Sequence, residues 1–556
     1  MNKKVCSFPI LFALLALLIG TCAVVFPASA QAAPTSTGSI TVSGTVASSY
    51  DAYQIFSANV VDGDSDAKIA TDLAWASDAV RDAALPVLHS AGMPNSQTTA
   101  QEAAEWLNTD SHLTSALSAQ LARSLQSSGA EPVALNAGTT AELSCGYWLI
   151  VADDDAIAQG ETGTAPIMAL VGGSAVTVKP KAATPKVAKH VLEDSTAAWQ
   201  KAADATVADD LYWRLSATVP AGLTAYDTYT VRFVDTMSAG LDPSKVAASV
   251  RVYAAAGADG GFDVVQTGKD GRAGTEPAKG WTDITAQCAT KVAADGKTFT
   301  VRTGDLIAAL GGADAFTAGA RVVAVYNAPL NGACNHGIAK GNPNEVYLRY
   351  PRSPFADQSG DAGFTRTPSD DACAYTWDLA LTKRGSDGDK PLARAVLSIA
   401  DDRGRTLAAD GTWDAEGKAT VTTGEDGRVT VSGVDSGKLE VRELKAPKGY
   451  TAFEGTRSVT VKAEGLDVDQ VAAAKPKLTI TAESPLRADS ADGSTGSLEA
   501  SLINTPTGTP PSITTGGFMP STGDMAMYAA AAAAVAGAAL LVVALLVKRG
   551  GGSHKE

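Results

Sequence analysis

Short runs of β-forming residues separated by turn residues recur through most of this 556-residue chain. Between residues 38 and 504 the runs contain many Val, Ile, Thr, Tyr and Phe residues, and Gly, Asp, Asn and Pro stand between them. Several runs alternate apolar and polar residues with period two, as residues 39–46 do, which predicts half-buried strands. Many short strands at this spacing are typical of β-sandwiches. We therefore predict a mainly β fold of tandem β-sandwich domains.

The first strand-rich segment contains one predicted helical insertion. Thr99 and Glu102 have the spacing of a capping box. Four leucines then recur every four residues, as on the apolar face of a helix, at Leu113, Leu117, Leu121 and Leu125. Strands are expected to resume at residues 147–151 and 167–178.

The first 30 residues have the composition of a secretory signal peptide. Lys3 and Lys4 precede an apolar stretch at residues 10–25, and Ala28-Ser29-Ala30 is a small-residue cleavage site. An exported chain can form disulfides. Cys288 with Cys334 and Cys334 with Cys373 are possible pairs, and free thiols are an equal alternative; the cysteines beyond the signal are Cys145, Cys288, Cys334 and Cys373.

An apolar run at residues 526–547 stands near the end of the chain. About 22 residues at a rise of about 1.5 Å can cross a hydrocarbon core of about 30 Å. Lys548 and Arg549 follow the run and mark its cytoplasmic end under the positive-inside rule. We predict a transmembrane helix at 526–547 with the preceding chain outside the cell. Residues 505–518, rich in Pro, Thr and Gly, are expected to form a linker.

Composition and motifs argue against several classes of function. The net charge of -15 and the pI near 4.9 disfavour nucleic-acid binding. The five histidines are widely scattered and suggest no metal site, and the chain contains no Gly-rich phosphate loop, HExxH or Gly-x-Ser-x-Gly motif. We expect neither enzymatic turnover nor a cofactor.

The pentapeptide before the apolar run resembles the Leu-Pro-x-Thr-Gly sorting signal of Gram-positive surface proteins. It reads Met519-Pro520-Ser521-Thr522-Gly523, with Met519 where the family usually has Leu. The resemblance implies that a sortase cuts between Thr522 and Gly523 and passes the Thr522 carbonyl group to an amine. An ordinary single-pass anchor is the alternative.

Residues 377–504 resemble the B-type sandwich domain of collagen adhesins and pilins. The similar stretches are Leu379-Ala-Leu-Thr-Lys383, residues 439–450, which contain Glu443 and Ala-Pro-Lys-Gly-Tyr, and Leu502-Ile-Asn504-Thr-Pro. The resemblance implies an isopeptide bond in which Lys383 attacks the Asn504 amide while Glu443 assists. Burial favours the neutral amine that such an attack needs and also favours a protonated carboxyl group that can donate to the Asn504 carbonyl.

Residues 182–376 resemble the isopeptide-forming middle domain of fimbrial subunits. The similar stretches are residues 185–191, 233–241, 325–328 and 341–350. The resemblance implies that Lys189 is the nucleophile, Asp235 the proton shuttle and Asn344 the acceptor. Asn342 stays an alternative acceptor, and Pro351-Arg352 stand where relatives often carry Asn.

Residues 34–181 resemble the N-terminal domain of pilins and end in a motif similar to Trp-x-x-x-Val-x-Val-Tyr-Pro-Lys. Val176, Val178, Pro180 and Lys181 match it, whereas Gly172 and Lys179 replace Trp and Tyr. The resemblance implies that Lys181 accepts the threonine acyl group of the next subunit.

These resemblances together identify the chain as a backbone pilin assembled by sortase, with immunoglobulin-like and collagen-adhesin-type sandwiches. The implied partners are a pilin-specific sortase, other copies of the chain, minor tip or base pilins, peptidoglycan and a host surface ligand, without nucleic acid. The implied location is the cell surface, covalently attached to the pilus or wall by the sorting signal at 519–556. A wall-anchored adhesin or minor pilin, whose first domain binds a host ligand, is the alternative function.

Overall fold

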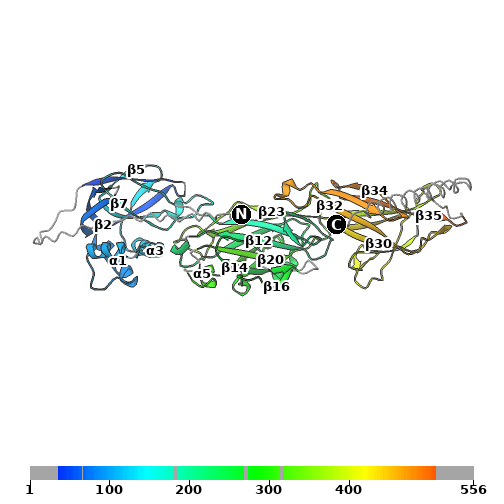
Figure 1. Cartoon of the computed structure of the whole chain (residues 1–556), viewed down its shortest axis with the longest axis horizontal. Coiled ribbons are helices and arrows are strands. Elements are labelled where there is room, and N and C mark those ends of the chain that lie inside the picture. Colours follow the sequence, from blue (N-terminus) through cyan, green and yellow to red (C-terminus); the bar gives the residue numbers. More distant parts are fainter. Residues whose placement is uncertain are drawn as a thin grey trace, which may run out of the picture.

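The computed structural model describes residues 36–508, apart from residues 45, 65, 66, 110, 181–183, 222, 264, 268–272, 313, 314, 316 and 317. Three strand-rich bodies follow one another along the long axis of the molecule (Figure 1). We call them the first unit (β1–β8), the middle unit (β9–β23) and the last unit (β24–β35). The prediction of a mainly β fold with tandem sandwiches and a helical insertion is confirmed.

The first unit contains a three-stranded sheet, β5-β1-β8, and a five-stranded sheet in which β3-β2-β6-β7 are in order and β4 also pairs with β2. Its strands are β1 (Thr37–Val42), β2 (Ser49–Asp62), β3 (Lys68–Trp75), β4 (Val133–Asn136), β5 (Thr140–Ser144), β6 (Gly146–Ala152), β7 (Ile167–Val171) and β8 (Val176–Val178). Tyr50 and Trp148 belong to the core shared by the two sheets, whereas Ile55 and Leu149 pack with the helices.

Three helices form the insertion: α1 (Asp78–Ser90), α2 (Ala100–Asn108) and α3 (Ser115–Ser127). The capping box of Thr99 and Glu102 begins α2, and Leu121 and Leu125 of α3 are fully buried. Leu113 precedes α3 and is 38% exposed. The sequence pattern missed α1, which has Pro86 in its interior, where proline normally disfavours a helix.

The middle unit is a sandwich of a six-stranded sheet, β10-β9-β12-β20-β14-β17, and a seven-stranded sheet, β11-β23-β21-β13-β19-β18, with β22 on β21. Its elements are β9 (Lys186–Glu193), β10 (Ala198–Gln200), β11 (Ala202–Asp204), β12 (Tyr212–Val219), β13 (Arg232–Met237), α4 (Val246–Ser249), β14 (Arg251–Ala256), β15 (Val265–Thr267), β16 (Ala273–Pro277), β17 (Thr282–Asp283), β18 (Ala289–Val292), β19 (Thr298–Arg302), α5 (Leu306–Ala309), β20 (Ala320–Asn327), β21 (Asn342–Pro351), β22 (Phe364–Arg366) and β23 (Asp370–Tyr375). One continuous core, which includes Trp213, Phe233 and Phe299, fills the sandwich.

The last unit pairs its first strand directly with its last. β24 and β35 are parallel neighbours in the sheet β29-β24-β35-β31, with β34 also on β35, and the facing sheet is β27-β26-β25-β30-β32-β33, with β28 on β25. Its strands are β24 (Trp377–Gly385), β25 (Val396–Ala400), β26 (Thr406–Leu407), β27 (Trp413–Asp414), β28 (Val421–Thr422), β29 (Arg428–Val434), β30 (Gly437–Lys445), β31 (Tyr450–Thr451), β32 (Thr456–Glu464), β33 (Lys477–Ala482), β34 (Leu486–Asp492) and β35 (Ser497–Pro506). Strand β35 thus extends through Pro506, into the segment expected to be a linker.

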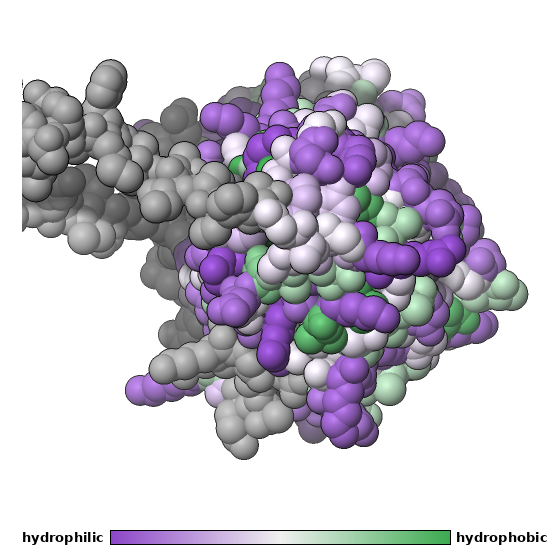
Figure 2. All heavy atoms as spheres, turned by 90° about the vertical axis from the view of Figure 1, so that its right-hand side faces the viewer, coloured by the Kyte–Doolittle hydropathy of each residue, from purple (hydrophilic) through white to green (hydrophobic). Residues whose placement is uncertain are grey.

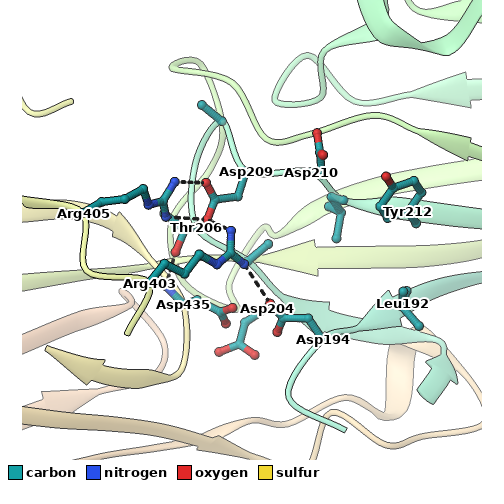
Figure 3. Close-up of a pocket in the computed structure, with 13 residues that line it drawn as sticks. Leu192, Asp194, Asp204, Thr206, Asp209, Asp210, Tyr212, Arg403, Arg405 and Asp435 are labelled. Atoms are coloured by element: carbon teal, nitrogen blue, oxygen red, sulfur yellow. Dashed lines mark hydrogen bonds and ion pairs between the residues drawn. The ribbon is translucent and has the colours of Figure 1, made fainter. Parts of the chain in front are cut away.

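Hydrogen bonds and ion pairs connect consecutive units. The end of β21 and the residue after it contact the first unit, where Tyr350 OH donates to Gly160 O (2.7 Å) and Arg352 O accepts from Gly163 N (2.7 Å). Between the middle and last units, Arg405 donates two hydrogen bonds to Asp209, at 2.5 and 2.8 Å, and Arg403 donates to Asp209 (2.9 Å) (Figure 3). Each joint therefore has specific polar contacts in addition to the covalent chain.

The surface at the end of the last unit is mostly hydrophilic, with small separated hydrophobic patches (Figure 2). Across the described ranges, no helix has the length and apolar character that a membrane span requires. The predicted helix at 526–547 lies outside those ranges, as do the predicted signal peptide and the sorting pentapeptide at 519–523.

Candidate functional site

The last unit buries a lysine, a glutamate and an asparagine against one another. Lys383 Nζ, on β24, donates a hydrogen bond to Asn504 Oδ1 on the neighbouring strand β35. Glu443 comes from β30 of the facing sheet, and its Oε1 lies 2.9 Å from Lys383 Nζ and 2.9 Å from Asn504 Nδ2. The three residues that sequence reasoning selected in this unit thus form one contact cluster.

This cluster is shielded from water. Lys383 is 0% exposed, and its ammonium group lies 5.8 Å from the centre of the Phe453 ring. Phe453 N also donates to the second carboxylate oxygen of Glu443 (3.1 Å). Desolvation by burial lowers the pKa of Lys383 to about 8, although Glu443 opposes the shift. A larger fraction of the Lys383 amine is therefore neutral than for an exposed lysine.

The middle unit assembles a second cluster across its two sheets. Lys189 is on β9 and Tyr326 on β20 of one sheet, whereas Asp235 and Asn344 are on the adjacent strands β13 and β21 of the other. Lys189 Nζ donates to Asp235 Oδ2 and to Tyr326 OH (2.9 Å). Asn344 Nδ2 also donates to Tyr326 OH (2.8 Å), so the phenol joins the lysine to the amide.

Burial shifts the ionisation of this second cluster. Lys189, Asp235 and Asn344 are each 0% exposed. Desolvation lowers the pKa of Lys189 to about 8 and raises the pKa of Asp235. Among the described residues, neither Asp235 Oδ1 nor Asn344 Oδ1 has a hydrogen-bond partner. Each buried acceptor without a partner lowers the stability of the fold by about 1–3 kcal/mol. Such destabilising groups are typical of reactive sites.

The structure separates the two candidate acceptors of the middle unit. Asn342 Oδ1 accepts from Asn335 N (2.8 Å), and its amide donates to Asn335 O (2.9 Å) and Ala374 O (3.2 Å). The Asn342 side chain therefore stabilises the connection between β20 and β21. Asn344, by contrast, contacts the Tyr326 hydroxyl that also contacts Lys189 and Asp235.

Sequence reasoning assigned no role to Tyr326 or Phe453. Tyr326 OH donates to Asp235 Oδ2 (3.0 Å), and it is the group shared by all three other members of its cluster. The stretch Val325-Tyr326-Asn327 contributed to the resemblance, yet its alternation shows only that Tyr326 faces inward. Phe453 follows the Gly449-Tyr450 turn, and no local pattern marks it as part of the Lys383 site.

The predicted inter-subunit acceptor, Lys181, lies outside the described residues, between β8 and β9. The departure at Gly172 has a steric reason. Its φ is +131°, and a Cβ there would lie 2.6 Å from Val60 Cβ and 2.9 Å from Cys145 Sγ. A tryptophan at this position would collide with the core of the first unit.

The four described cysteines are free thiols, so Cys334 forms a disulfide with neither Cys288 nor Cys373. Across the described part of the chain, no group of three or more His, Cys, Asp or Glu side chains is arranged to hold a metal ion.

Comparisons with known proteins agree with the recognition of a backbone pilin. Residues 378–475 match the SpaA family model, described as a prealbumin-like fold domain. The trypsin-resistant surface T6 protein of Streptococcus pyogenes serotype M6 is 29% identical over 143 residues. That match covers 24% of this chain and 24% of the relative, about a quarter of its length.

Several solved structures are similar in fold. The T6 backbone pilin of S. pyogenes serotype M6 has a TM-score of 0.45 and 17% identity, and the alignment covers 85% of this chain and 98% of that one. The full-length major pilin SpaD from Corynebacterium diphtheriae has a TM-score of 0.41 and 15% identity, with 86% and 100% coverage. BcpA, the major pilin subunit of Bacillus cereus, has a TM-score of 0.39 and 10% identity, with 85% and 99% coverage.

Proposed function

We propose that this chain is the shaft subunit of a covalently polymerised surface pilus, cross-linked internally by one Lys–Asn isopeptide bond in each of its middle and last units. The observation that carries the proposal is the repeated burial of a lysine amine against an acid in two successive sandwiches. An asparagine amide contacts the lysine directly in the last unit and through the Tyr326 hydroxyl in the middle unit. A buried cation of this kind is costly unless it is paired or converted to a neutral group.

In the last unit, one oxygen of Glu443 contacts both nitrogens that must exchange a proton. Lys383 Nζ attacks Asn504 Cγ as the neutral amine, and a new N–C bond forms. Glu443 Oε1, 2.9 Å from Lys383 Nζ and 2.9 Å from Asn504 Nδ2, can take the proton from the amine and give it to the departing nitrogen. Ammonia leaves, and the product is an amide between β24 and β35.

In the middle unit, the corresponding proton transfer from the lysine amine to the asparagine nitrogen passes through Tyr326. Asp235 Oδ2 accepts a proton from Lys189 Nζ, and Tyr326 OH lies 3.0 Å from that oxygen and 2.8 Å from Asn344 Nδ2. The phenol can therefore relay the proton to the nitrogen that leaves as ammonia. The resulting Lys189–Asn344 amide connects the two sheets of the sandwich.

Polymerisation joins one subunit to the next through the two ends of the chain. Sortase breaks the Thr522–Gly523 bond, and the Thr522 acyl group forms an amide with Lys181 Nζ of a neighbouring copy. The predicted export signal and sorting pentapeptide support this step, as does the resemblance of residues 172–181 to the pilin motif. The last copy would instead be attached to peptidoglycan, and minor pilins would stand at the tip or base.

Replacement of Lys181 tests the shaft function. We expect Lys181→Ala to abolish the SDS-resistant high-mass ladder of the cell-wall fraction, because the acyl acceptor is lost. Lys179→Ala is the matched control, since it removes a lysine two residues away and should leave the ladder intact. A ladder that persists in Lys181→Ala would contradict the assignment of Lys181. A wild-type protein that is only monomeric on the wall would favour the adhesin or minor-pilin alternative.

A further inference from the structure

A thiol, an imidazole and a carboxylate lie in a row where the middle unit meets the last unit. Cys334 Sγ is 3.5 Å from His336 Nε2, and His336 Nδ1 is 2.8 Å from Asp378 Oδ2. Cys334 and His336 belong to the connection between β20 and β21, whereas Asp378 is the second residue of β24. This row is separate from both lysine clusters.

The Asp378 carboxylate and the backbone around His336 are held in place by other contacts. Asp378 Oδ1 accepts from Ser432 Oγ (2.5 Å) and Gly433 N (3.0 Å), so its second oxygen faces the imidazole. The backbone on either side of His336 is also fixed, because Asn335 N donates to Asn342 Oδ1 (2.8 Å) and Gly337 N donates to Thr376 O (3.0 Å). The Asp378 carboxylate is therefore fixed within ion-pair distance of His336 Nδ1. Among the described residues this nitrogen accepts or donates no hydrogen bond, so Asp378 acts on the ring by its charge and stabilises the imidazole once it is protonated.

We infer that Cys334 is a nucleophilic thiol, that His336 is its general base and Asp378 its positioning residue, and that its co-reactants are small disulfides. Cys334 is half-buried, and the His336 side chain is 25% exposed, so a small molecule can reach the two side chains. A folded protein is too large to reach them, because the middle and last units meet at this point. Small disulfides are the soft electrophiles that an oxidising extracellular environment supplies.

The reaction is a thiol–disulfide exchange and needs no further oxidant. His336 Nε2 takes the proton from Cys334 Sγ, and the sulfur attacks one sulfur of R–S–S–R. A Cys334–S–S–R bond forms, the original S–S bond breaks, and R–S⁻ leaves with the proton that His336 returns. The Asp378 carboxylate stabilises the transient imidazolium.

The environment of the thiol makes the base necessary. Desolvation and the negative charge of Asp378 raise the pKa of the Cys334 thiol, so little thiolate forms without help. A more basic sulfur is also a stronger nucleophile once its proton is removed. Cys288 provides an internal comparison: it is half-buried, burial raises its pKa to about 11, and its Sγ donates to Ile284 O (3.2 Å).

The test measures the exchange of each thiol in the purified full chain with 4,4′-dithiodipyridine near neutral pH. The released thiopyridone gives the rate, and peptide mass spectrometry assigns it to a cysteine. We expect Cys334 to react at least about tenfold faster than Cys288, and His336→Gln to remove that advantage. Asp378→Asn should lower the Cys334 rate less severely. His112→Gln, a histidine of the first unit, is the matched control and should change neither rate.

The pH profile separates base catalysis from a structural effect. In the wild type, the Cys334 rate should rise at lower pH than the Cys288 rate, and His336→Gln should move the Cys334 profile toward that of Cys288. An unchanged Cys288 rate in each variant shows that the fold is retained. Equal rates of Cys334 and Cys288 in the wild type, or an equal or faster Cys334 rate in His336→Gln, would overturn the inference.

Discussion

Lys189 and Lys383 are among the largest fully buried side chains of the molecule, although lysine is rarely buried without a partner. Each has an acidic neighbour, yet burial outweighs that neighbour and lowers the pKa of both lysines to about 8. An ion pair is thus a poor final state for these residues. Conversion of each amine to an amide would remove the charge and leave a neutral, hydrogen-bonded group in the core.

Residue replacement distinguishes the two candidate acceptors of the middle unit. We expect Asn344→Ala to prevent the Lys189 cross-link, because it removes the amide beside Tyr326, and Asn342→Ala to retain it. In the wild type, digestion and mass spectrometry should recover Lys189 and Asn344 in one branched peptide, lighter by about 17 Da than its two parts because ammonia is lost. Recovery of Lys189 and Asn344 in unmodified linear peptides would contradict the proposed bond of the middle unit.

At the scale of elements, the joint between β9, β11 and the β29–β30 turn concentrates carboxylates. Asp204, at the end of β11, accepts from Trp377 Nε1 (2.6 Å) and Ser436 N (3.0 Å), and Glu193 accepts from Asp204 N (3.2 Å). Desolvation, followed by the charge of Asp204, raises the pKa of Glu193 to about 7, and burial also raises the pKa of Asp435. The surrounding charged groups are Asp194, Asp209, Arg403 and Arg405.

This cluster predicts that the joint is more stable in mild acid. At a pH below the usual pKa of a carboxyl group, Glu193 is protonated both when the middle and last units are in contact (the closed joint) and when they are separated (the opened joint). As pH rises toward about 7, the opened joint releases the proton first, so the closed joint loses stability. We expect a loss of about 1–3 kcal/mol between about pH 5 and pH 8, measured by hydrogen exchange of the β11 and β29 amides.

Substitution of Glu193 provides the control for this pH dependence. Glu193→Gln should flatten the pH response of the joint, whereas Glu105→Gln on the exposed face of α2 should leave it unchanged. Each exchange rate is divided by the intrinsic rate of an unprotected amide at the same pH, and stronger protection at pH 8 than at pH 5 in the wild type would contradict the predicted sign.

At the scale of the whole molecule, the proposed bonds define the path of tension along a pilus. Tension would enter at Lys181 and leave at Thr522, so the first unit would stand outside the loaded path. It would cross from Lys189 to Asn344 and from Lys383 to Asn504, which leaves residues 190–343 and 384–503 without load. The shaft would then resist extension because most of each loaded sandwich is bypassed.

Single-molecule pulling between Lys181 and the end of the last unit measures this bypass. We expect Asn504→Ala to add about 400 Å of extension and Asn344→Ala about 500 Å, at roughly 3.4 Å for each released residue. Asn342→Ala should extend no further than the wild type. If the two acceptor variants also match the wild-type length, the proposed cross-links carry no load.

The sequence by itself determined the strand-rich architecture and the α2 capping box, because alternation, turns and short motifs are local properties. Its resemblance to known domains singled out five residues of the two lysine clusters, namely Lys189, Asp235, Lys383, Glu443 and Asn504, and missed Tyr326. It left Asn342 and Asn344 as alternatives, since residues two apart on a strand face the same side. Only the tertiary structure shows that Asn344 contacts Tyr326, that α1 forms although it contains Pro86, and that Cys334 and His336 lie beside Asp378. These arrangements depend on packing between sheets and units far apart in the chain, where no local pattern specifies which side chains meet.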